Sequence, residues 1–124
     1  MSDTLLAIVG TRQCLRPVNA AITAFMESLD REIIIVTGDA SGVDAHVKRE
    51  CKRLGFRLIV CHARWDHAGK RAGPERNTVV ARLANRAVAW PASDPEHREL
   101  SAGTWNCIDQ FLARGKDVRE EGWR

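Results

Sequence analysis

The sequence lacks the features of several protein classes. Among its 124 residues there is no tyrosine, and no apolar run approaches the roughly 20 residues that a membrane-spanning helix requires. Lysine and arginine form no long block, so the net charge of +3 suits an anionic ligand without pointing to nucleic acid. The start, Met1-Ser2-Asp3-Thr4, has no basic region of a signal peptide, so we expect a cytoplasmic protein with no membrane partner.

Paired cysteines are absent from the sequence as well. The four cysteines, at positions 14, 51, 61 and 107, form no C-x-x-C pair, so we expect free thiols in a reducing compartment. A zinc site from Cys61, His62 and His67 is conceivable, but its spacing matches no standard ligand pattern. We therefore expect no metal. The chain is too short for two separate cores, which favours a single domain over residues 1–124.

Short apolar runs alternate with longer amphipathic stretches along the chain. The runs expected to be strands are 5–9, 33–36, 57–61, 87–90 and a short edge strand at 117–119. The stretches expected to be helices are about 17–29, 43–54, 75–85 and 104–114, with a long loop at 62–74. This alternation predicts an α/β fold, a Rossmann-like doubly wound parallel sheet of about five strands with helices on both faces. The loops after its strands gather at one edge, where ligands bind.

Four segments at this edge carry chemistry that suits phosphate. Glycine lets the backbone approach a ligand, helix N-termini favour anions, Arg and Lys pair with phosphate, and Trp can stack on a base. The candidate ligand-binding residues are Gly10, Thr11, Arg12, Gly38, Ser41, Gly42, Asp44, Trp65, Gly69, Lys70, Gly73, Arg76, Asn77, Gly103 and Thr104. Plain structural alternatives stay open for some of them: Gly10-Thr11-Arg12 as a strand-ending turn with no ligand, Asp44 as a first-turn acid, Trp65 as a seal of the core, and Thr104 as an N-cap.

Two of these segments resemble a known superfamily. The turn Gly38-Asp39-Ala40-Ser41-Gly42-Val43-Asp44 is similar to the GGA-x-G-x-D turn of the SLOG superfamily, which includes DNA-processing protein A and the LOG phosphoribohydrolases. The stretch from Trp65 to Asn77 is similar to the W-x-x-x-G-K-x-A-G-P-x-R-N signature of its small YspA-like members, and Gly103-Thr104 matches their late G-T pair. The resemblance implies a Rossmann-like fold and a pocket for a nucleotide or nucleotide derivative. It implies no further cofactor.

The sequence also departs from the superfamily pattern. Asp39 stands where a second glycine is usual, and Ser41 where arginine is common. In LOG enzymes a catalytic glutamate follows the G-T pair, but here the sequence continues with Trp105-Asn106-Cys107. The missing carboxylate argues against phosphoribohydrolase activity of the LOG type.

Three functions are open from the sequence. The first is a sensor or ligand-binding module for a nucleotide or nucleotide-derived, phosphate-bearing small molecule. The second is a hydrolase that cleaves an N-glycosidic or phosphoester bond, which needs a carboxylate such as Asp44 or Glu75. The third is a protein that binds single-stranded DNA, which the modest charge and the lack of tyrosine disfavour. A homodimer is plausible for the superfamily.

Overall fold

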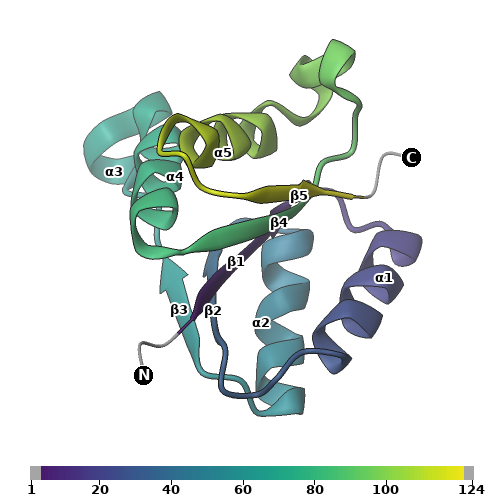
Figure 1. The fold of residues 1–124 in the computed structure, drawn as a ribbon. Coiled ribbons are helices and arrows are strands. Elements are labelled where there is room, and N and C mark those ends of the chain that lie inside the picture. The colour runs from purple at the N-terminus through teal and green to yellow at the C-terminus, as the bar shows by residue number, and fades with distance from the viewer. Residues whose placement is uncertain (1–3, 122–124) are drawn as a thin grey trace.

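The chain folds as a parallel sheet between two pairs of helices. The computed structural model describes residues 4–121, so Met1-Ser2-Asp3 and the last three residues of the expected domain 1–124 lie outside the described residues. The five strands, which all pair in parallel, run in the order β3-β2-β1-β4-β5 (Figure 1). Their bounds are β1 (Leu5–Gly10), β2 (Ile34–Gly38), β3 (Leu58–Cys61), β4 (Arg86–Trp90) and β5 (Val118–Glu120). This order confirms the predicted doubly wound α/β fold.

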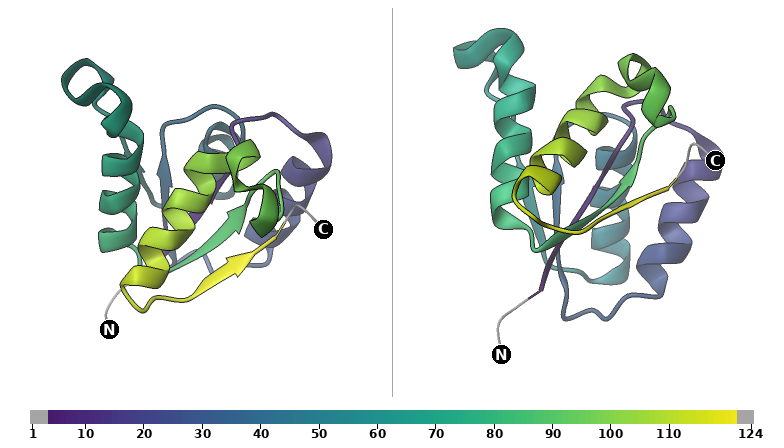
Figure 2. Two further views of the ribbon diagram at one scale, coloured as in Figure 1. Left: turned by 90° about the horizontal axis from the view of Figure 1, so that it is seen from above. Right: turned by 45° about the horizontal axis from the view of Figure 1, so that its top comes forward.

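The central strand β1 is apolar because both of its faces are covered. Leu6 and Ile8 pack on one side with the helices α1 (Arg16–Glu27) and α2 (Val43–Leu54). Ala7 and Val9 pack on the other side with α4 (Ala72–Leu83) and α5 (Ala102–Ala113). All four side chains are buried. Continuous apolar runs are typical of strands in sheets with helices on both faces, an arrangement that Figures 1 and 2 show from three directions.

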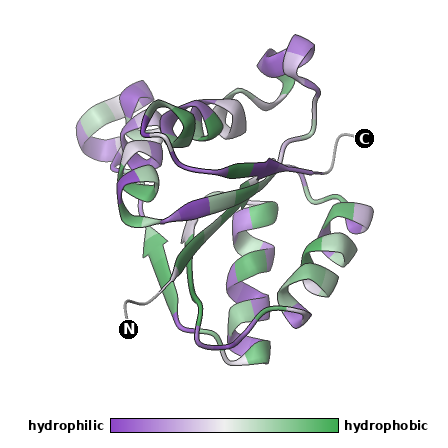
Figure 3. Cartoon of the chain, in the orientation of Figure 1, coloured by the Kyte–Doolittle hydropathy of each residue, from purple (hydrophilic) through white to green (hydrophobic). Residues whose placement is uncertain are grey.

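Helix α2 has the bounds that its flanking glycines predict. It begins after Gly42 and ends at Gly55, which adopts a φ of 82° and donates its N–H to the carbonyl of Cys51 at 2.9 Å. Only glycine adopts this left-handed conformation without strain, so it stops the helix sharply. Every residue of the neighbouring edge strand β3 is apolar, as its colour in Figure 3 shows.

The predicted loop at 62–74 is wrong. A short helix α3 (Trp65–Ala68) and a 3₁₀ turn η1 (Gly69–Arg71) occupy most of this segment and lead directly into α4, which begins three residues earlier than predicted. Gly69, with a φ of 56°, allows the change of direction between α3 and α4, and Pro74 lies in the first turn of α4, where its missing N–H leaves no bond unmade. Figure 2 shows α3 projecting beyond the sheet.

The segment between β4 and α5, for which the sequence predicted no regular element, is partly helical. Residues 95–101 form the 3₁₀ helix η2 (Pro95–Ser101), which precedes α5 and is mostly hydrophilic in Figure 3. Asp94 caps η2 because its carboxylate accepts the N–H groups of Glu96 at 2.9 Å and His97 at 3.0 Å. None of the helices formed by residues 4–121 has the length and apolar character to cross a membrane.

Candidate ligand-binding site

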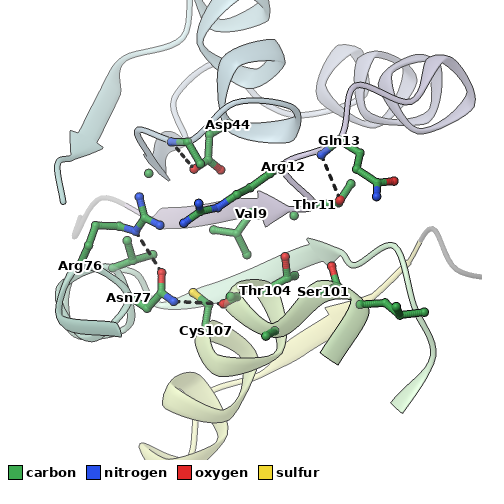
Figure 4. A pocket seen from close by; sticks show the side chains of 17 residues that line it. Val9, Thr11, Arg12, Gln13, Asp44, Arg76, Asn77, Ser101, Thr104 and Cys107 are labelled. Atoms are coloured by element: carbon green, nitrogen blue, oxygen red, sulfur yellow. Dashed lines mark hydrogen bonds between the residues drawn. The ribbon is translucent and has the colours of Figure 1, made fainter. Parts of the chain in front are cut away.

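A pocket of about 220 Å³ opens at the carboxyl edge of the sheet, beside β1, where the strand order reverses. Its walls are the ends of β1 and β2, the loop after β1, the start of α2, the middle of α4, and the junction of η2 with α5 (Figure 4). The predicted ligand-binding residues that line it are Gly10, Thr11, Arg12, Gly38, Asp44, Arg76, Asn77, Gly103 and Thr104. Reversal points of parallel sheets bind ligands because loops on either side of them diverge and leave a crevice.

The other predicted residues lie outside this lining. Lys70 is exposed on η1, and Gly69 lies beside it at the end of α3. Trp65 is 49% exposed and packs over Gly73, where an added Cβ would lie 3.5 Å from the indole ring. The Arg12 guanidinium lies 5.7 Å from the centroid of the same ring. Trp65 therefore contacts the site through Arg12 rather than from within the pocket.

Ser41 and Gly42 hold the loop after β1 in place. The Ser41 hydroxyl donates to the carbonyl of Arg12 at 3.0 Å, and the Val43 N–H donates to the carbonyl of Thr11 at the same distance. Gly42 has a φ of 72°, and a Cβ there would lie 2.4 Å from the Thr11 carbonyl oxygen. The Ser41 hydroxyl and the Val43 N–H, which could have bound an anion at the start of α2, thus donate to the protein's own backbone instead. This turn positions Arg12.

Asp44 is buried beneath the same turn. Its carboxylate accepts the Thr37 hydroxyl and the Ala40 N–H, each at 3.1 Å. Burial raises the pKa of Asp44, and the hydrogen bonds and the nearby Arg76 guanidinium partly offset that effect. Gly38 makes the arrangement possible, since a Cβ there would lie 2.6 Å from the Asp44 carboxylate and 2.7 Å from Arg76. The first-turn role that the sequence left open for Asp44 is therefore present in the structure.

Arg76 connects three walls of the pocket. It is only 8% exposed, and its Nη1 donates to the Asp39 carboxylate at 2.6 Å. Its Nε donates to the Asn77 side-chain oxygen at 3.0 Å, and the Asn77 amide nitrogen donates to the carbonyl of Gly103 at 3.0 Å. The relay joins β2 through α4 to α5. Sequence reasoning noted Asp39 as a departure from the family pattern and as a candidate carboxylate for a hydrolase, but missed its role as the partner of Arg76.

The α5 wall combines small polar side chains with an apolar rim. Thr104 is the third residue of α5 and does not act as its N-cap, so that alternative is wrong. Ser101 accepts the Ala92 N–H at 3.1 Å, and Leu100 is 65% exposed at the rim. Neither Ser101 nor Leu100 is among the predicted ligand-binding residues, because both lie between the strand expected at 87–90 and the helix expected at 104–114.

Comparison with known proteins places the chain in a family. The family of DNA recombination-mediator protein A matches residues 1–66, which is more than half of the chain. The chain belongs to this family. The assignment confirms the resemblance to the SLOG superfamily. The matched residues supply β1, α1, β2, α2, β3 and the relay residue Asp39, whereas Arg76, Asn77 and the α5 wall lie in the remainder of the chain.

The fold of the family domain is also found in a solved structure. DNA processing protein A from Streptococcus pneumoniae matches with a TM-score of 0.79 and 20% sequence identity, over 95% of this chain and 50% of that one. This chain therefore spans about half the length of that protein. At this identity the likeness establishes the shared fold. No curated protein matches the sequence significantly.

The family domain presents few reactive groups to its pocket. Among the described residues Asp44 supplies the single carboxylate in the lining, and its hydrogen bonds to the turn occupy it. Glu75, the other candidate catalytic residue, is exposed and faces a separate shallow hollow beside His62 and Arg64. Burial raises the pKa of Cys107 to about 12, so its thiol stays protonated at neutral pH.

Proposed function

We propose that the pocket binds a nucleotide or nucleotide-derived, phosphate-bearing small molecule and that the protein acts as a ligand-binding or sensor module. The supporting observation is Arg12, an exposed guanidinium at the pocket that has no carboxylate within ion-pair distance among residues 4–121. Arginine pairs with phosphate through two parallel hydrogen bonds, and the first turn of α5 across the pocket adds a favourable dipole.

The size of the pocket indicates how much of such a ligand it encloses. Pockets that surround a drug-sized molecule measure roughly 300–1,000 Å³. The present volume of about 220 Å³ is below that range and suits a phosphate with its sugar. The base would then lie at the rim, where the exposed side chain of Leu100 offers an apolar contact.

Calorimetric titration with a panel of nucleotides tests this proposal. Replacement of Arg12 by Gln should weaken binding by about tenfold or more, because the main free cation of the pocket is lost. Arg16→Gln is the matched control, since Arg16 is an exposed cation at the start of α1 that does not line the pocket. Absence of binding by every nucleotide, or equal losses in both variants, would refute the proposal.

Single-stranded DNA is the second candidate ligand. Trp65 is half exposed beside Arg12, and an aromatic ring next to a cation is the usual platform for an unpaired base. The family is also described by its part in DNA recombination. Trp65→Ala should weaken the binding of an oligonucleotide by about 1–3 kcal/mol if a base stacks on Trp65. The same change should leave a mononucleotide in the pocket nearly unaffected, because Trp65 is not part of the lining.

A further inference from the structure

The two arginines of the pocket differ in how much charge they can offer a ligand. Both line it, and in Figure 4 the Arg12 side chain extends toward the guanidinium of Arg76. Arg12 has no acidic partner in the described part of the chain, whereas Arg76 is held by Asp39 at 2.6 Å. The second Asp39 oxygen accepts the Ala63 N–H at 3.1 Å and lies 3.4 Å from His62. Asp39 is thus fixed from both sides and cannot swing away from Arg76 without losing these contacts.

The charges that face a ligand therefore add up to little. Arg76 and Asp39 cancel each other, and Arg12 contributes one positive charge. The N-terminus of α5 adds about half a unit charge. Asp44 subtracts one charge when it is ionised and none when it is protonated. The pocket thus offers about half a positive charge when Asp44 is ionised and about one and a half when it is protonated. With Asp44 ionised, this sum is closer to the single charge of a phosphodiester than to the charge of about −1.5 to −2 on a terminal phosphate.

We infer that the site takes a singly charged phosphodiester, and that Asp39 is the specificity-determining residue that removes the advantage of a doubly charged terminal phosphate. The inference rests on the proposed function and refines its ligand class. A second negative charge would lose its hydration without gaining a free cation, because the nearest guanidinium is already paired. Its neighbours would be the carboxylates of Asp39 and Asp44.

Base-free probes test this charge preference without knowledge of the base. Dimethyl phosphate carries one charge, and methyl phosphate carries nearly two at a pH well above about 6. We expect methyl phosphate to bind the wild-type protein no more than about threefold more tightly than dimethyl phosphate, as judged from NMR shifts of the Gly103 and Thr104 amides. A preference for methyl phosphate of about tenfold or more would overturn the inference, whatever the variants do.

Asp39→Asn releases Arg76 and keeps the oxygen that accepts the Ala63 N–H. We expect it to raise the affinity for methyl phosphate by about tenfold relative to that for dimethyl phosphate. Asp66→Asn is the control, because it removes the same charge from an exposed position on α3 that contacts His67 and not Arg76. Equal changes for both probes, or equal effects of both variants, would overturn the role of Asp39.

Two outcomes concern the proposed function itself. If no phosphate probe shifts the pocket amides, the phosphate site fails and this inference fails with it. Cyclic mononucleotides and an oligothymidylate without terminal phosphates then distinguish the two sources of a phosphodiester, a small molecule and a nucleic acid. The one that binds more tightly than dimethyl phosphate identifies the source. If neither does, the nucleotide function fails although the charge preference stands.

Discussion

Replacement of Gly42 by alanine should destabilise the protein, because the turn before α2 packs closely against the loop after β1 and leaves no room for a side chain. Gly42 has φ 72° and ψ −121°, a conformation that costs a residue with a side chain about 1–3 kcal/mol. The new Cβ would also lie 2.4 Å from the Thr11 carbonyl oxygen and 2.5 Å from the Arg12 carbonyl carbon. These are backbone atoms, so the contact can be relieved only if the loop moves away from α2.

Gly69 provides the matched control. Its φ of 56° and ψ of −129° are nearly those of Gly42, but a Cβ there would meet no atom within 4 Å. Gly69→Ala therefore carries the conformational strain alone. Gly42→Ala adds overpacking of about 1–3 kcal/mol and loss of the hydrogen bond from Val43 to Thr11, about 1 kcal/mol. The difference between the variants should be about 2–4 kcal/mol.

Urea unfolding of both variants, followed by far-UV circular dichroism, measures this difference. Thermal midpoints should differ by on the order of 10 °C, with Gly42→Ala the lower. The same variant should bind nucleotides more weakly, since the displaced loop carries Arg12. Free energies of unfolding that agree within about 0.5 kcal/mol would refute the reasoning, because the contact with the β1 loop would then contribute nothing beyond strain.

Three further changes test other parts of the structure. Lys116→Met should lower the free energy of unfolding by about 1–3 kcal/mol in a urea titration, because the ammonium group donates to three carbonyl oxygens at the end of α4. Burial raises the pKa of Asp44, so the folded protein binds the proton of this carboxyl group more tightly than the unfolded chain does. The free energy of unfolding of Asp44→Asn should therefore increase relative to that of the wild type as pH rises from 3.8, the ordinary pKa of the group, through its raised pKa in the folded protein. Above the raised pKa, the difference between the two proteins should be constant. Arg98→Leu removes contacts with Asp109 and Trp105 that are partly exposed, so it should lower stability by at most about 1 kcal/mol and should speed amide exchange in η2 first.

The regular elements could be predicted wherever glycine marks a turn that the helix or strand pattern also requires. Gly42 and Gly55 flank α2, and its predicted bounds agree with the structure. The same rule failed at Gly73 and Pro74, which were interpreted as loop residues but lie in the first turn of α4. Trp65 packs over Gly73, a contact eight residues apart in the sequence that no local pattern reveals.

The candidate site was predictable as a location and less so as a set of contacts. Parallel strands bring their carboxyl ends together, so the sequence placed Gly10, Gly38 and Gly103 at one edge, and all three line the pocket. The pairing of Asp39 with Arg76 joins residues 37 positions apart, and it depends on how α4 packs against β2. No pattern within a single segment encodes that pairing.

The distribution of the contacts also explains why the pocket depends on both halves of the chain. The half that matches the family fixes the loop that carries Arg12 through two hydrogen bonds to backbone carbonyls, one from the Val43 N–H and one from the Ser41 hydroxyl. The other half is held by side chains, since Arg76 and Asn77 connect Asp39 to the carbonyl of Gly103. A substitution of Asp39 or Arg76 changes the charge of the pocket, whereas a substitution of Asn77 removes its contact with α5. Ligand preference within this fold can therefore change through a few residues of α4 and of the turn after β2, which do not hold the loop that carries Arg12.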